Sequence, residues 1–468
     1  MQDEPEKEIQ QIEIMRDIVI KDFRCYTEKT MDFRRGINLL IGDNAVGKTS
    51  LLRACNLVAN SFFCGFSDEN TVWKSADGDD FREIKTEEVE LDEMPINIAF
   101  HLDSSDCPPI RLADGTAVEL DAKQHREETT ETPDLCIEKK SKKNARNLVT
   151  GLKPLKDYAA LLQANSTTIV GGKAEQRNAL PLFAYFTTED IHTVRKFDKE
   201  KKKFKKYPQK PSFGYFESFD CKGLLDCWAT RLLVLKEAKQ GETEIECVRK
   251  AVVSALGNGC GIINDMEVRV NDGSIVFHYC DGREVRSDLL SDGYRRLVSI
   301  VVDLAFRSAL LNKVIYGNEA YKKTHGTVII DEIDEHLHPA LQVRILKALH
   351  ETFPGIQFIV STHSPLVMSS VETNEENVVY KLEFKDGIYT HTELNTYGLD
   401  ASTIVNVYMG QPPRDLDIDA EIKRIEKLID DAAYTEARKA LEKLRERPGS
   451  DVNPDLASIE ATLSFFEE

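Results

Sequence analysis

The sequence predicts an α/β fold in which a mixed sheet is interrupted by a long insertion and followed by a helical tail. Three observations support this prediction. An apolar strand at residues 37–41 runs into a glycine-containing loop and a helix. Two more apolar strands, at residues 327–330 and 357–360, each end in polar residues. Beyond residue 411 the composition changes to charged, amphipathic helix.

Composition restricts the class of protein. With 468 residues, of which 41% are hydrophobic and 30% charged, the chain has enough apolar material for a large core and an appendage. Apolar runs such as residues 327–330 are far shorter than the roughly 20 residues of a membrane helix, so we expect no membrane association. The net charge of −19 argues against nucleic acid coating the whole surface. Any nucleic-acid contact must be local.

Cysteine usage and the N-terminus indicate a cytoplasmic protein. The ten cysteines include no C-x-x-C pair, and their spacing suggests neither a zinc ribbon nor a disulfide scaffold. We expect reduced, mostly buried thiols. Residues 1–11 are charged and lack the apolar stretch of a signal peptide.

Four regions follow from the order of these patterns. Residues 1–60 and 265–410 are expected to form the two halves of the α/β core, residues 61–264 an insertion with a helical lobe and basic loops, and residues 411–468 the tail. The insertion contains a predicted buried strand at 180–186 and a predicted helix at 224–255. Amphipathic helices in the tail should need the body or a partner to cover their apolar stripe.

The second half of the core carries its own pattern. Alternating runs at 267–270 and 274–279 bracket Asn271-Asp272-Gly273 and predict a hairpin. A helix is expected from about residue 292 to Leu310, and another from Pro339 to Thr352, between the two apolar strands.

The first chemical motif is the loop between the strand at 37–41 and the helix that follows. Its sequence, Gly42-Asp43-Asn44-Ala45-Val46-Gly47-Lys48-Thr49, matches G-x-x-x-x-G-K-[ST] and continues into Ser50. Backbone N–H groups of such a loop surround phosphate oxygens, Lys48 neutralises phosphate charge, and the Thr49 hydroxyl ligates Mg²⁺. A chance glycine turn is the alternative, and the flanking strand and helix disfavour it.

The second motif is a buried strand that ends in the adjacent carboxylates Asp331 and Glu332. Open α/β sheets bind ligands at this edge. Asp331 is expected to hold Mg²⁺, and Glu332 to orient the attacking water. An ordinary strand end is the alternative when the motif is taken alone.

Two further sequence elements, at His363 and at residues 290–293, are candidate phosphate contacts if a phosphate site is present. His363 follows the strand at 357–360 and can donate a hydrogen bond to a transferring phosphoryl group, although a lone histidine is more often structural. Leu290-Ser291-Asp292-Gly293 opens a helix, where Ser291 is either a helix cap or part of a second phosphate contact.

In this order, the motifs resemble the ATPase head of ABC-type proteins, especially the RecF, SMC and OLD-like branch. The resemblance covers roughly residues 12–60 and 265–410 and includes Ile333-Asp334-Glu335 as the D-loop and residues 361–365 as the switch-histidine segment. It implies a P-loop ATPase that binds ATP and Mg²⁺, with Lys48, Glu332 and His363 in catalysis. In that family two heads sandwich two ATP molecules, which places Ser291 and Gly293 in the partner's site and implies a homodimer or a larger homo-oligomer.

The chain departs from the family pattern in two places and leaves a third open. Ala45 and Asp292 each stand where the family usually has glycine. The family also places a glutamine between the phosphate loop and the signature, and Gln163 and Gln176 are in range without any context that selects either.

A short insertion and a helical tail, without sustained heptads, resemble the PtuA-type ATPases of Septu and retron anti-phage systems. The tail segments 433–441 and 456–465 carry this resemblance. It implies a nucleotide-gated sensor that scaffolds and controls a separate HNH nuclease of the PtuB type, in some operons together with a retron reverse transcriptase and its msDNA.

Two other functions stay open. A RecF-like DNA-repair ATPase shares the same motifs. An OLD-like ATPase that is itself a nuclease needs a Toprim carboxylate set, for which residues 415–419 supply acids in front of a charged helix.

A basic run is the candidate for nucleic-acid contact. Lysines crowd residues 195–210, most densely between Lys201 and Lys206, with Phe197, Phe204 and Tyr207 interleaved. The lysines are expected to contact phosphates, and the aromatic rings to stack on bases. A solvated loop is the alternative.

Overall fold

The computed structural model describes residues 15–86, 89–102, 110–111, 117–118, 135–143, 146–170, 173–176, 178–188, 201–206, 209–220, 224–411, 416–447 and 453–467. The chain forms two compact units, Met1–Gly398 and Leu399–Glu468. The predicted tail begins at residue 411, whereas the structural division falls at Gly398; the boundaries at 60, 264 and 410 stay predictions.

The centre of the first unit is a six-stranded sheet in the order β12-β16-β17-β3-β18-β19. Its strands are β3 (Ile37–Ile41), β12 (Leu182–Phe186), β16 (Gly326–Ile330), β17 (Ile356–Ser361), β18 (Val378–Lys385) and β19 (Ile388–Leu394). Every adjacent pair is parallel except β18 and β19, which form an antiparallel hairpin. Every residue of β3, β12, β16 and β17 is buried, which explains their continuous apolar sequences. The predicted α/β class with a mixed sheet is confirmed.

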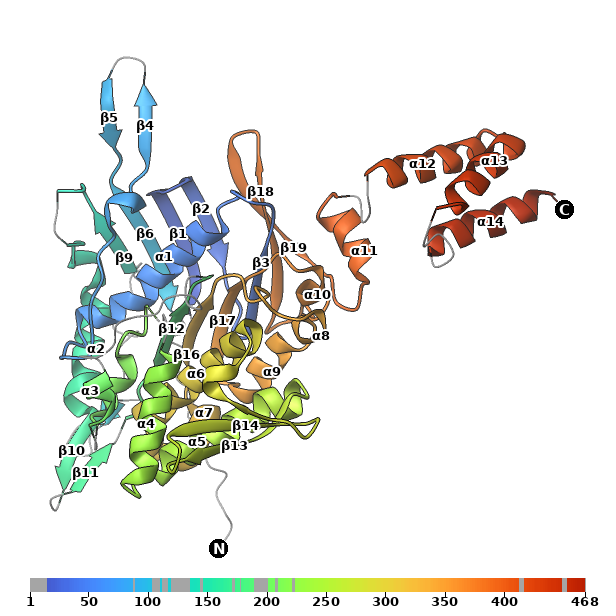
Figure 1. The fold of residues 1–468 in the computed structure, drawn as a ribbon. Coiled ribbons are helices and arrows are strands. Elements are labelled where there is room, and N and C mark those ends of the chain that lie inside the picture. Colours follow the sequence, from blue (N-terminus) through green and yellow to red (C-terminus); the bar gives the residue numbers. More distant parts are fainter. Residues whose placement is uncertain are drawn as a thin grey trace, which may run out of the picture. The chain divides into compact units, whose positions relative to one another are not determined.

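A second sheet is antiparallel, in the order β2-β1-β6-β9. Its strands are β1 (Met15–Phe23), β2 (Tyr26–Asp32), β6 (Ile96–Leu102) and β9 (Leu135–Lys139). Helix α1 (Lys48–Asn60) contacts β1 and β6 of this sheet and β12, β16 and β17 of the other, so it lies between the two sheets (Figure 1). Ten of its residues are buried for this reason.

The side chain of Gln357 joins the two sheets. It is fully buried on β17, and its Oε1 accepts hydrogen bonds from the Met15 N–H and the Thr327 hydroxyl, both at 3.0 Å. Its Nε2 donates to the carbonyl oxygens of Met15 at 2.8 Å and Arg34 at 2.9 Å. Because every donor and acceptor of this amide is paired, its hydrogen bonds offset the cost of removing it from water.

The predicted insertion supplies strands of both sheets, namely β6, β9 and β12. The strand predicted at 180–186 is β12. The helix predicted at 224–255 is broken: α4 (Leu225–Glu237) and α5 (Glu242–Val252) meet at Gly241, whose φ of 64° lies in the left-handed region. Glycine adopts that conformation without a Cβ clash, so the chain turns there. A π-helix (Val253–Gly259) continues from α5.

Smaller elements complete the insertion. The helices are α2 (Lys153–Ser166) and α3 (Lys201–Phe204). Three two-stranded ribbons pair β4 (Glu83–Thr86) with β5 (Val89–Glu93), β7 (Ile110–Arg111) with β8 (Ala117–Val118), and β10 (Thr167–Val170) with β11 (Lys173–Gln176).

The second half of the core follows the sequence prediction closely. The predicted hairpin is β13 (Ile263–Arg269) with β14 (Ser274–Tyr279), to which β15 (Glu284–Arg286) adds a third strand. Helix α6 (Asp292–Tyr316) extends six residues beyond the predicted end and packs against α5 and β12. The helix predicted over 339–352 is divided into α8 (Pro339–Gln342) and α9 (Ile345–Thr352); α7 (Ala320–Lys323) and α10 (Pro365–Met368) are single turns.

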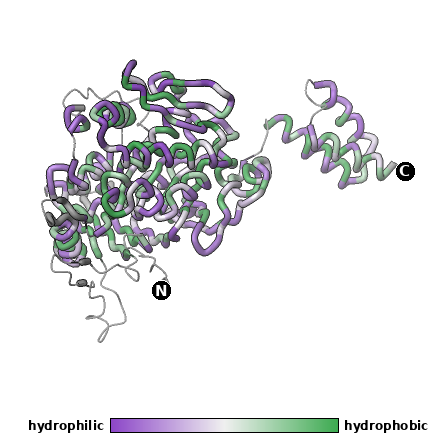
Figure 2. Tube along the Cα trace, turned by 90° about the horizontal axis from the view of Figure 1, so that it is seen from below, coloured by the Kyte–Doolittle hydropathy of each residue, from purple (hydrophilic) through white to green (hydrophobic). Residues whose placement is uncertain are grey.

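The second unit contains α11 (Ala401–Thr403), a π-helical turn (Ile404–Tyr408) and the helices α12 (Leu416–Asp430), α13 (Tyr434–Arg445) and α14 (Pro454–Glu467). The last three helices bury one apolar cluster among themselves, and Figure 2 shows hydrophobic and hydrophilic positions alternating along them. Its buried members are Ile422, Ile425, Ala437, Leu441, Leu444, Leu456, Ile459 and Leu463. The expectation that this stripe needs another surface is wrong, because three facing helices cover it mutually.

Two compositional expectations can be compared with the structure. Among the described residues, no helix combines the length and apolar character needed to span a membrane. Eight cysteines are described, all with free thiols; four are buried, three are partly buried and Cys280 is exposed.

We predict that Leu441→Ala destabilises the cluster of α12, α13 and α14. Truncating a buried leucine costs about 2–5 kcal/mol, and so small a core rarely supplies more than about 3–5 kcal/mol in total. Hydrogen exchange of peptides from residues 416–447 and 453–467 should accelerate strongly, while peptides from the six-stranded sheet keep their protection. The exposed Lys443→Ala on the same helix is the control. Equal exchange in both variants would contradict the assignment of Leu441 to a cooperative core.

Candidate functional site

The loop between β3 and α1 is held open by left-handed backbone at three positions. The φ values are 145° at Gly42, 64° at Ala45 and 95° at Gly47. A Cβ on Gly42 would lie 2.4 Å from the Leu382 carbonyl oxygen, and one on Gly47 would lie 2.4 Å from the Tyr26 hydroxyl. Glycine is therefore required at both. Ala45 adopts the conformation with a side chain, at a cost of about 1–2 kcal/mol.

Helix α1 presents its N-terminus to this loop without a cap. Gly47 precedes it, no side chain caps it, and its first turn contains no acidic residue. The first intrahelical bond of the helix runs from the Leu51 N–H to the Gly47 carbonyl at 2.9 Å, so the preceding N–H groups have no partner within the helix. Such an N-terminus favours an anion.

The Lys48 ammonium lies inside the loop. It donates to the carbonyl oxygens of Gly42 at 2.7 Å and Asp43 at 2.9 Å. Burial lowers the pKa of Lys48, and the nearby carboxylates of Asp331 and Glu332 oppose that shift. A buried cation is thus held where the loop curls.

Asp331 joins three elements at the carboxyl edge of the sheet. Its Oδ2 accepts a hydrogen bond from the Thr49 hydroxyl at 3.2 Å, and its Oδ1 accepts one from the Ser361 hydroxyl at 2.5 Å. The phosphate loop, the end of β16 and the end of β17 therefore converge on one carboxylate.

Glu332 lies beside Asp331 in a strained conformation. Its φ is 49°, and its N–H donates to the Ser361 hydroxyl at 2.8 Å. The carboxylate is 40% exposed and stands 3.9 Å from His363 Nε2. Partial burial, and secondarily the negative charge of Asp331, raises the pKa of Glu332. A carboxylate in a sheet-edge position with a raised pKa is suited to handling a proton or a water.

The segment that carries His363 is fixed by Asp334. Asp334 Oδ1 accepts from the Thr362 hydroxyl at 2.5 Å and from the His363 N–H at 3.3 Å. Ser364 caps the following turn and donates to Gln342 Oε1 at 2.6 Å. The residues after β16 therefore position the residues after β17.

The start of α6 contacts the segment after β16 within the same chain. A Cβ on Gly293 would lie 2.3 Å from the His336 carbonyl oxygen, so the helix approaches that backbone as closely as glycine permits. The guanidinium of Arg296, only 3% exposed, donates to Glu335 Oε2 at 2.5 Å and to the Asp331 carbonyl at 2.7 Å. Ser291 is the N-cap residue, is exposed, and makes no side-chain cap hydrogen bond, so the cap alternative is not supported.

The structure thus brings Lys48, Thr49, Asp331, Glu332 and His363 together around the loop. Sequence reasoning missed two supports: Arg296, which donates to the Asp331 carbonyl, and Tyr26, which donates to the Gly47 carbonyl. It named Ser361 and Asp334 only as members of their motifs, without their hydrogen bonds to the Asp331 carboxylate and the His363 N–H. No motif singles out Tyr26 or Arg296, because their roles arise from contacts between distant segments.

The residues fit Mg²⁺ held together with a phosphate ligand. The Thr49 hydroxyl and the Asp331 carboxylate supply neighbouring oxygens, the ligand type that Mg²⁺ prefers. Among the described residues there is no cluster of three or more His, Cys, Asp or Glu side chains suited to a metal.

Neither glutamine in range of the family position lies at this site. Gln163 binds the backbone of Ser67 through both ends of its amide. The Gln176 amide is buried beneath α6 and donates to the Leu311 carbonyl at 2.6 Å. Neither Gln163 nor Gln176 therefore occupies the position of the family's glutamine.

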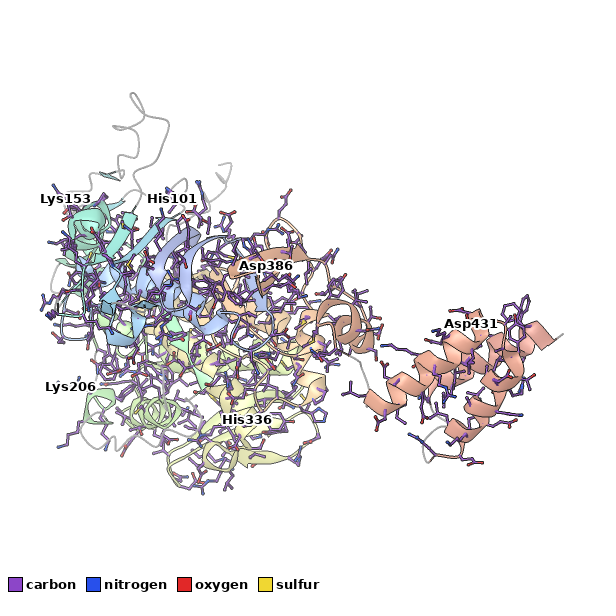
Figure 3. All side chains as sticks on the ribbon, turned by 90° about the horizontal axis from the view of Figure 1, so that it is seen from above. His101, Lys153, Lys206, His336, Asp386 and Asp431 are labelled. Carbon is purple, nitrogen blue, oxygen red and sulfur yellow. The ribbon has the colours of Figure 1, made fainter. Side chains whose placement is uncertain are left out.

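The basic run is only partly as expected. Lys202, Lys203, Lys205 and Lys206 are exposed, and Lys206 projects from the edge of the first unit (Figure 3). Phe204 is fully buried and packs edge-to-face on Trp228 at 4.8 Å, so its predicted stacking on bases is wrong. Phe197 and Tyr207 lie outside the described residues, and phosphate contact by the lysines stays a prediction.

The acidic run at 415–419 was predicted to precede a charged helix, but α12 already begins at Leu416, so its described acids lie inside the helix. Asp417 and Asp419 lie in the first turn of α12, where the helix dipole stabilises negative charge. Asp419 also pairs with Lys423 at 2.7 Å. Asp415 lies outside the described residues.

Two family models match the chain. Residues 14–226 match the "AAA ATPase domain" model, and residues 176–369 match "AAA domain, putative AbiEii toxin, Type IV TA system". The two matched ranges contain the phosphate loop and the Asp331 strand, respectively.

Two relatives are similar over shorter segments. The "Retron Vc95 probable ATPase" of Vibrio cholerae serotype O1 biovar El Tor is 39% identical over 122 residues, which are 26% of this chain and 23% of that protein. The Septu protein PtuA of Bacillus mycoides (strain KBAB4) is 31% identical over 128 residues, 26% of this chain and 17% of that protein. The predicted resemblance to retron and Septu ATPases is confirmed, although the matched segments cover less than a quarter of either relative.

Among solved structures, an SmcHead bound to the C-winged helix domain of ScpA aligns with 81% of this chain and 97% of its own, at 14% identity and a TM-score of 0.42.

We predict that Arg296→Ala loosens the segment after β16. The substitution leaves Glu335 without its cation and the Asp331 carbonyl without a donor, which should lower the free energy of unfolding by about 2 kcal/mol. Urea unfolding measures the loss, and hydrogen exchange over residues 331–337 localises it.

The adjacent Arg295→Ala is the matched control. Arg295 pairs with Asp226 at 3.0 Å in a partly exposed ion pair, which is worth no more than about 1 kcal/mol. A loss as small in Arg296→Ala as in Arg295→Ala would show that α6 does not brace this segment.

Proposed function

We propose that this chain is an ATPase that binds ATP with Mg²⁺ at the loop before α1 and hydrolyses it with Glu332 as the water-orienting residue. The observation that carries the proposal is the convergence of Thr49, Asp331 and Glu332 beside the buried ammonium of Lys48. These residues come from segments about 280 positions apart.

Binding follows from the charges that surround the loop. The uncapped N–H groups of α1 receive phosphate oxygens, and Lys48 exchanges its contacts with the Gly42 and Asp43 carbonyls for contacts with phosphate. Thr49 and Asp331 would hold Mg²⁺, which would supply positive charge beside the phosphates.

Hydrolysis follows from the position of Glu332. Its carboxylate orients a water toward the terminal phosphate, and His363, 3.9 Å away, donates a hydrogen bond to the transferring group. Ser361 and Asp334 keep Glu332 and His363 in place through hydrogen bonds to their backbone N–H groups.

A second copy of the chain completes the site in this proposal. Ser291 and the N-terminus of α6 contact the terminal phosphate bound by the partner, and Gly293 lets the helix start close to its own His336 backbone. Ser291 is exposed and its side chain makes no capping hydrogen bond to α6, which supports this role. The functional unit is then a homodimer or a larger homo-oligomer.

In the cell, we place this ATPase in bacterial anti-phage defence, where its nucleotide state controls a separate HNH nuclease. Similarity to retron and Septu ATPases supports this role, as does the separate helical unit as a docking element. A RecF-like repair role and an OLD-like nuclease are the alternatives. Co-purification with neighbouring gene products separates them: a nuclease or reverse transcriptase supports defence, and recombination proteins support repair.

We predict that Glu332→Gln keeps ATP binding and slows hydrolysis at least about a hundredfold, because the water loses its orienting carboxylate. The variant should accumulate ATP-bound dimers. Turnover assays and size-exclusion chromatography with and without ATP measure both effects.

Glu351→Gln serves as control, since Glu351 is an exposed acid on α9 that lies in an exposed pair with Lys347. It should hydrolyse ATP at the unaltered rate. Normal turnover by Glu332→Gln would remove Glu332 from the proposed role.

The raised pKa of Glu332 predicts that the hydrolysis rate begins to fall at a higher pH than it would with an ordinary glutamate. Only the ionised carboxylate accepts a proton from water, so kcat should fall as the pH drops through a pKa above the ordinary value of 4.5. Rates measured between pH 4.5 and 8, with folding followed by circular dichroism, give this limb. A flat profile down to pH 4.5 in folded protein would contradict the prediction.

A further inference from the structure

The turn between β1 and β2 lies against the end of the phosphate loop and leads directly into Tyr26, the first residue of β2. Within this turn, the Arg24 N–H donates to the Asp80 carbonyl at 3.0 Å, and the Arg24 guanidinium donates to the Asp80 carboxylate at 2.8 Å. The same fully buried carboxylate accepts a hydrogen bond from Arg53 of α1 at 2.9 Å. The turn is therefore tied to the helix that follows the phosphate loop.

Tyr26 is a fully buried residue whose hydroxyl reaches the phosphate loop. The O–H donates to the Gly47 carbonyl at 2.9 Å. The ring packs edge-to-face on Tyr389 of β19, with 5.0 Å between the ring centroids. Burial raises the pKa of Tyr26, so the hydroxyl keeps its proton and stays a donor. Because protein encloses the ring on all sides, it is not available to stack on a nucleotide base.

The Gly47 carbonyl belongs to the peptide group that joins Gly47 to Lys48. In a trans peptide the C=O and the N–H point in opposite directions. The carbonyl points into α1, where it accepts from the Leu51 N–H at 2.9 Å, so the Lys48 N–H points out of the helix toward the loop. The second lone pair of this carbonyl accepts from Tyr26. Together the two hydrogen bonds determine the orientation of the peptide plane.

Glycine makes this orientation easy to lose. The φ of Gly47 is 95°, and glycine also occupies negative φ at little cost, so the peptide after it can rotate. A rotated peptide would turn its carbonyl oxygen toward the phosphates in place of the N–H. Phosphate oxygens attract N–H groups and repel carbonyl oxygens, so only one orientation is competent for binding. A site whose competent state is only partly populated binds more weakly in proportion.

We propose that Tyr26 is a positioning residue for the diphosphate part of ATP, whose hydroxyl keeps the peptide between Gly47 and Lys48 with its N–H toward the phosphates. The proposal rests on the proposed ATPase function and deepens it. Tyr26 acts through this peptide and does not touch the nucleotide. Backbone N–H groups of such a loop surround the α- and β-phosphates, which ATP and ADP share. Tyr26 therefore contributes equally to the binding of both nucleotides.

The test separates binding from hydrolysis. Tyr26→Phe removes the hydroxyl and keeps the ring. ATP and ADP, each with Mg²⁺, are titrated by calorimetry in the Glu332→Gln background, which prevents turnover during the measurement. Both Kd values should rise by the same factor of about five, because one neutral hydrogen bond is lost.

Turnover supplies the second readout. In Tyr26→Phe without the Glu332 substitution, kcat at saturating ATP should equal that of the unsubstituted chain, because Glu332 and His363 keep their backbone hydrogen bonds to Ser361 and Asp334. A merely structural role of the hydroxyl would lower the stability of the fold and leave both nucleotide affinities unchanged.

Two further variants make the result specific. Tyr321→Phe removes another buried tyrosine hydroxyl, on α7 before the amino end of β16, and should leave both Kd values unchanged. If Tyr26→Phe unfolds, 4-fluorophenylalanine at position 26 replaces it, because the fluorine fills the place of the hydroxyl without donating a hydrogen bond.

Unaltered ATP and ADP affinities in a folded Tyr26 variant overturn the role of Tyr26 alone, as does an equal loss of affinity in Tyr321→Phe. A loss confined to ATP, or a fall in kcat at saturating ATP with both affinities intact, also overturns it. If the Glu332→Gln parent binds neither nucleotide, the proposed function and this inference fail together.

Discussion

The structure of the site depends on the hydrogen bonds that Asp331 accepts from Thr49 and Ser361. A buried strand places the carboxylate at the sheet edge, and these two hydroxyls tie it to the phosphate loop and to the neighbouring strand. Without these two partners, Asp331 would be a buried carboxylate that lacks hydrogen bonds, which is costly. The same serine also accepts a hydrogen bond from the Glu332 N–H, so the carboxylates that we propose bind metal and orient water are positioned as one unit.

A second constraint links α6 to that unit. Gly293 packs on the His336 carbonyl, and Arg296 holds Glu335 and the Asp331 backbone. Asp334 in turn holds the N–H of His363. A ligand bound at the start of α6 would therefore contact a helix that is itself bonded, through Arg296, to Glu335 and to the Asp331 backbone. In the proposed dimer, this contact gives each copy a route from the partner's nucleotide to its own catalytic segment.

Some predictions succeeded because they rest on local rules. The G-x-x-x-x-G-K-T spacing, the apolar run before Asp331 and the hairpin at Asn271-Asp272-Gly273 each specify backbone geometry within a few residues. The tail helices were predicted from their stripe, but not that the stripe is buried internally at Leu441 and Leu463, because helix pairing is a long-range property. Phe204 was misjudged for the same reason: its neighbours in sequence are charged, while its neighbours in space are Trp228 and Phe213.

Local sequence patterns were enough to predict the phosphate loop, the two adjacent carboxylates and the strands β3, β12, β16 and β17, since each depends on residues that are close in sequence. The folded structure was needed to see that β12, from the middle of the predicted insertion, pairs beside β16. It also decided that Arg296 and Ser361 support that carboxylate. Strand order within a sheet is set by which apolar faces bury together, and neither the motif spacing nor the hydrophobic period encodes that pairing.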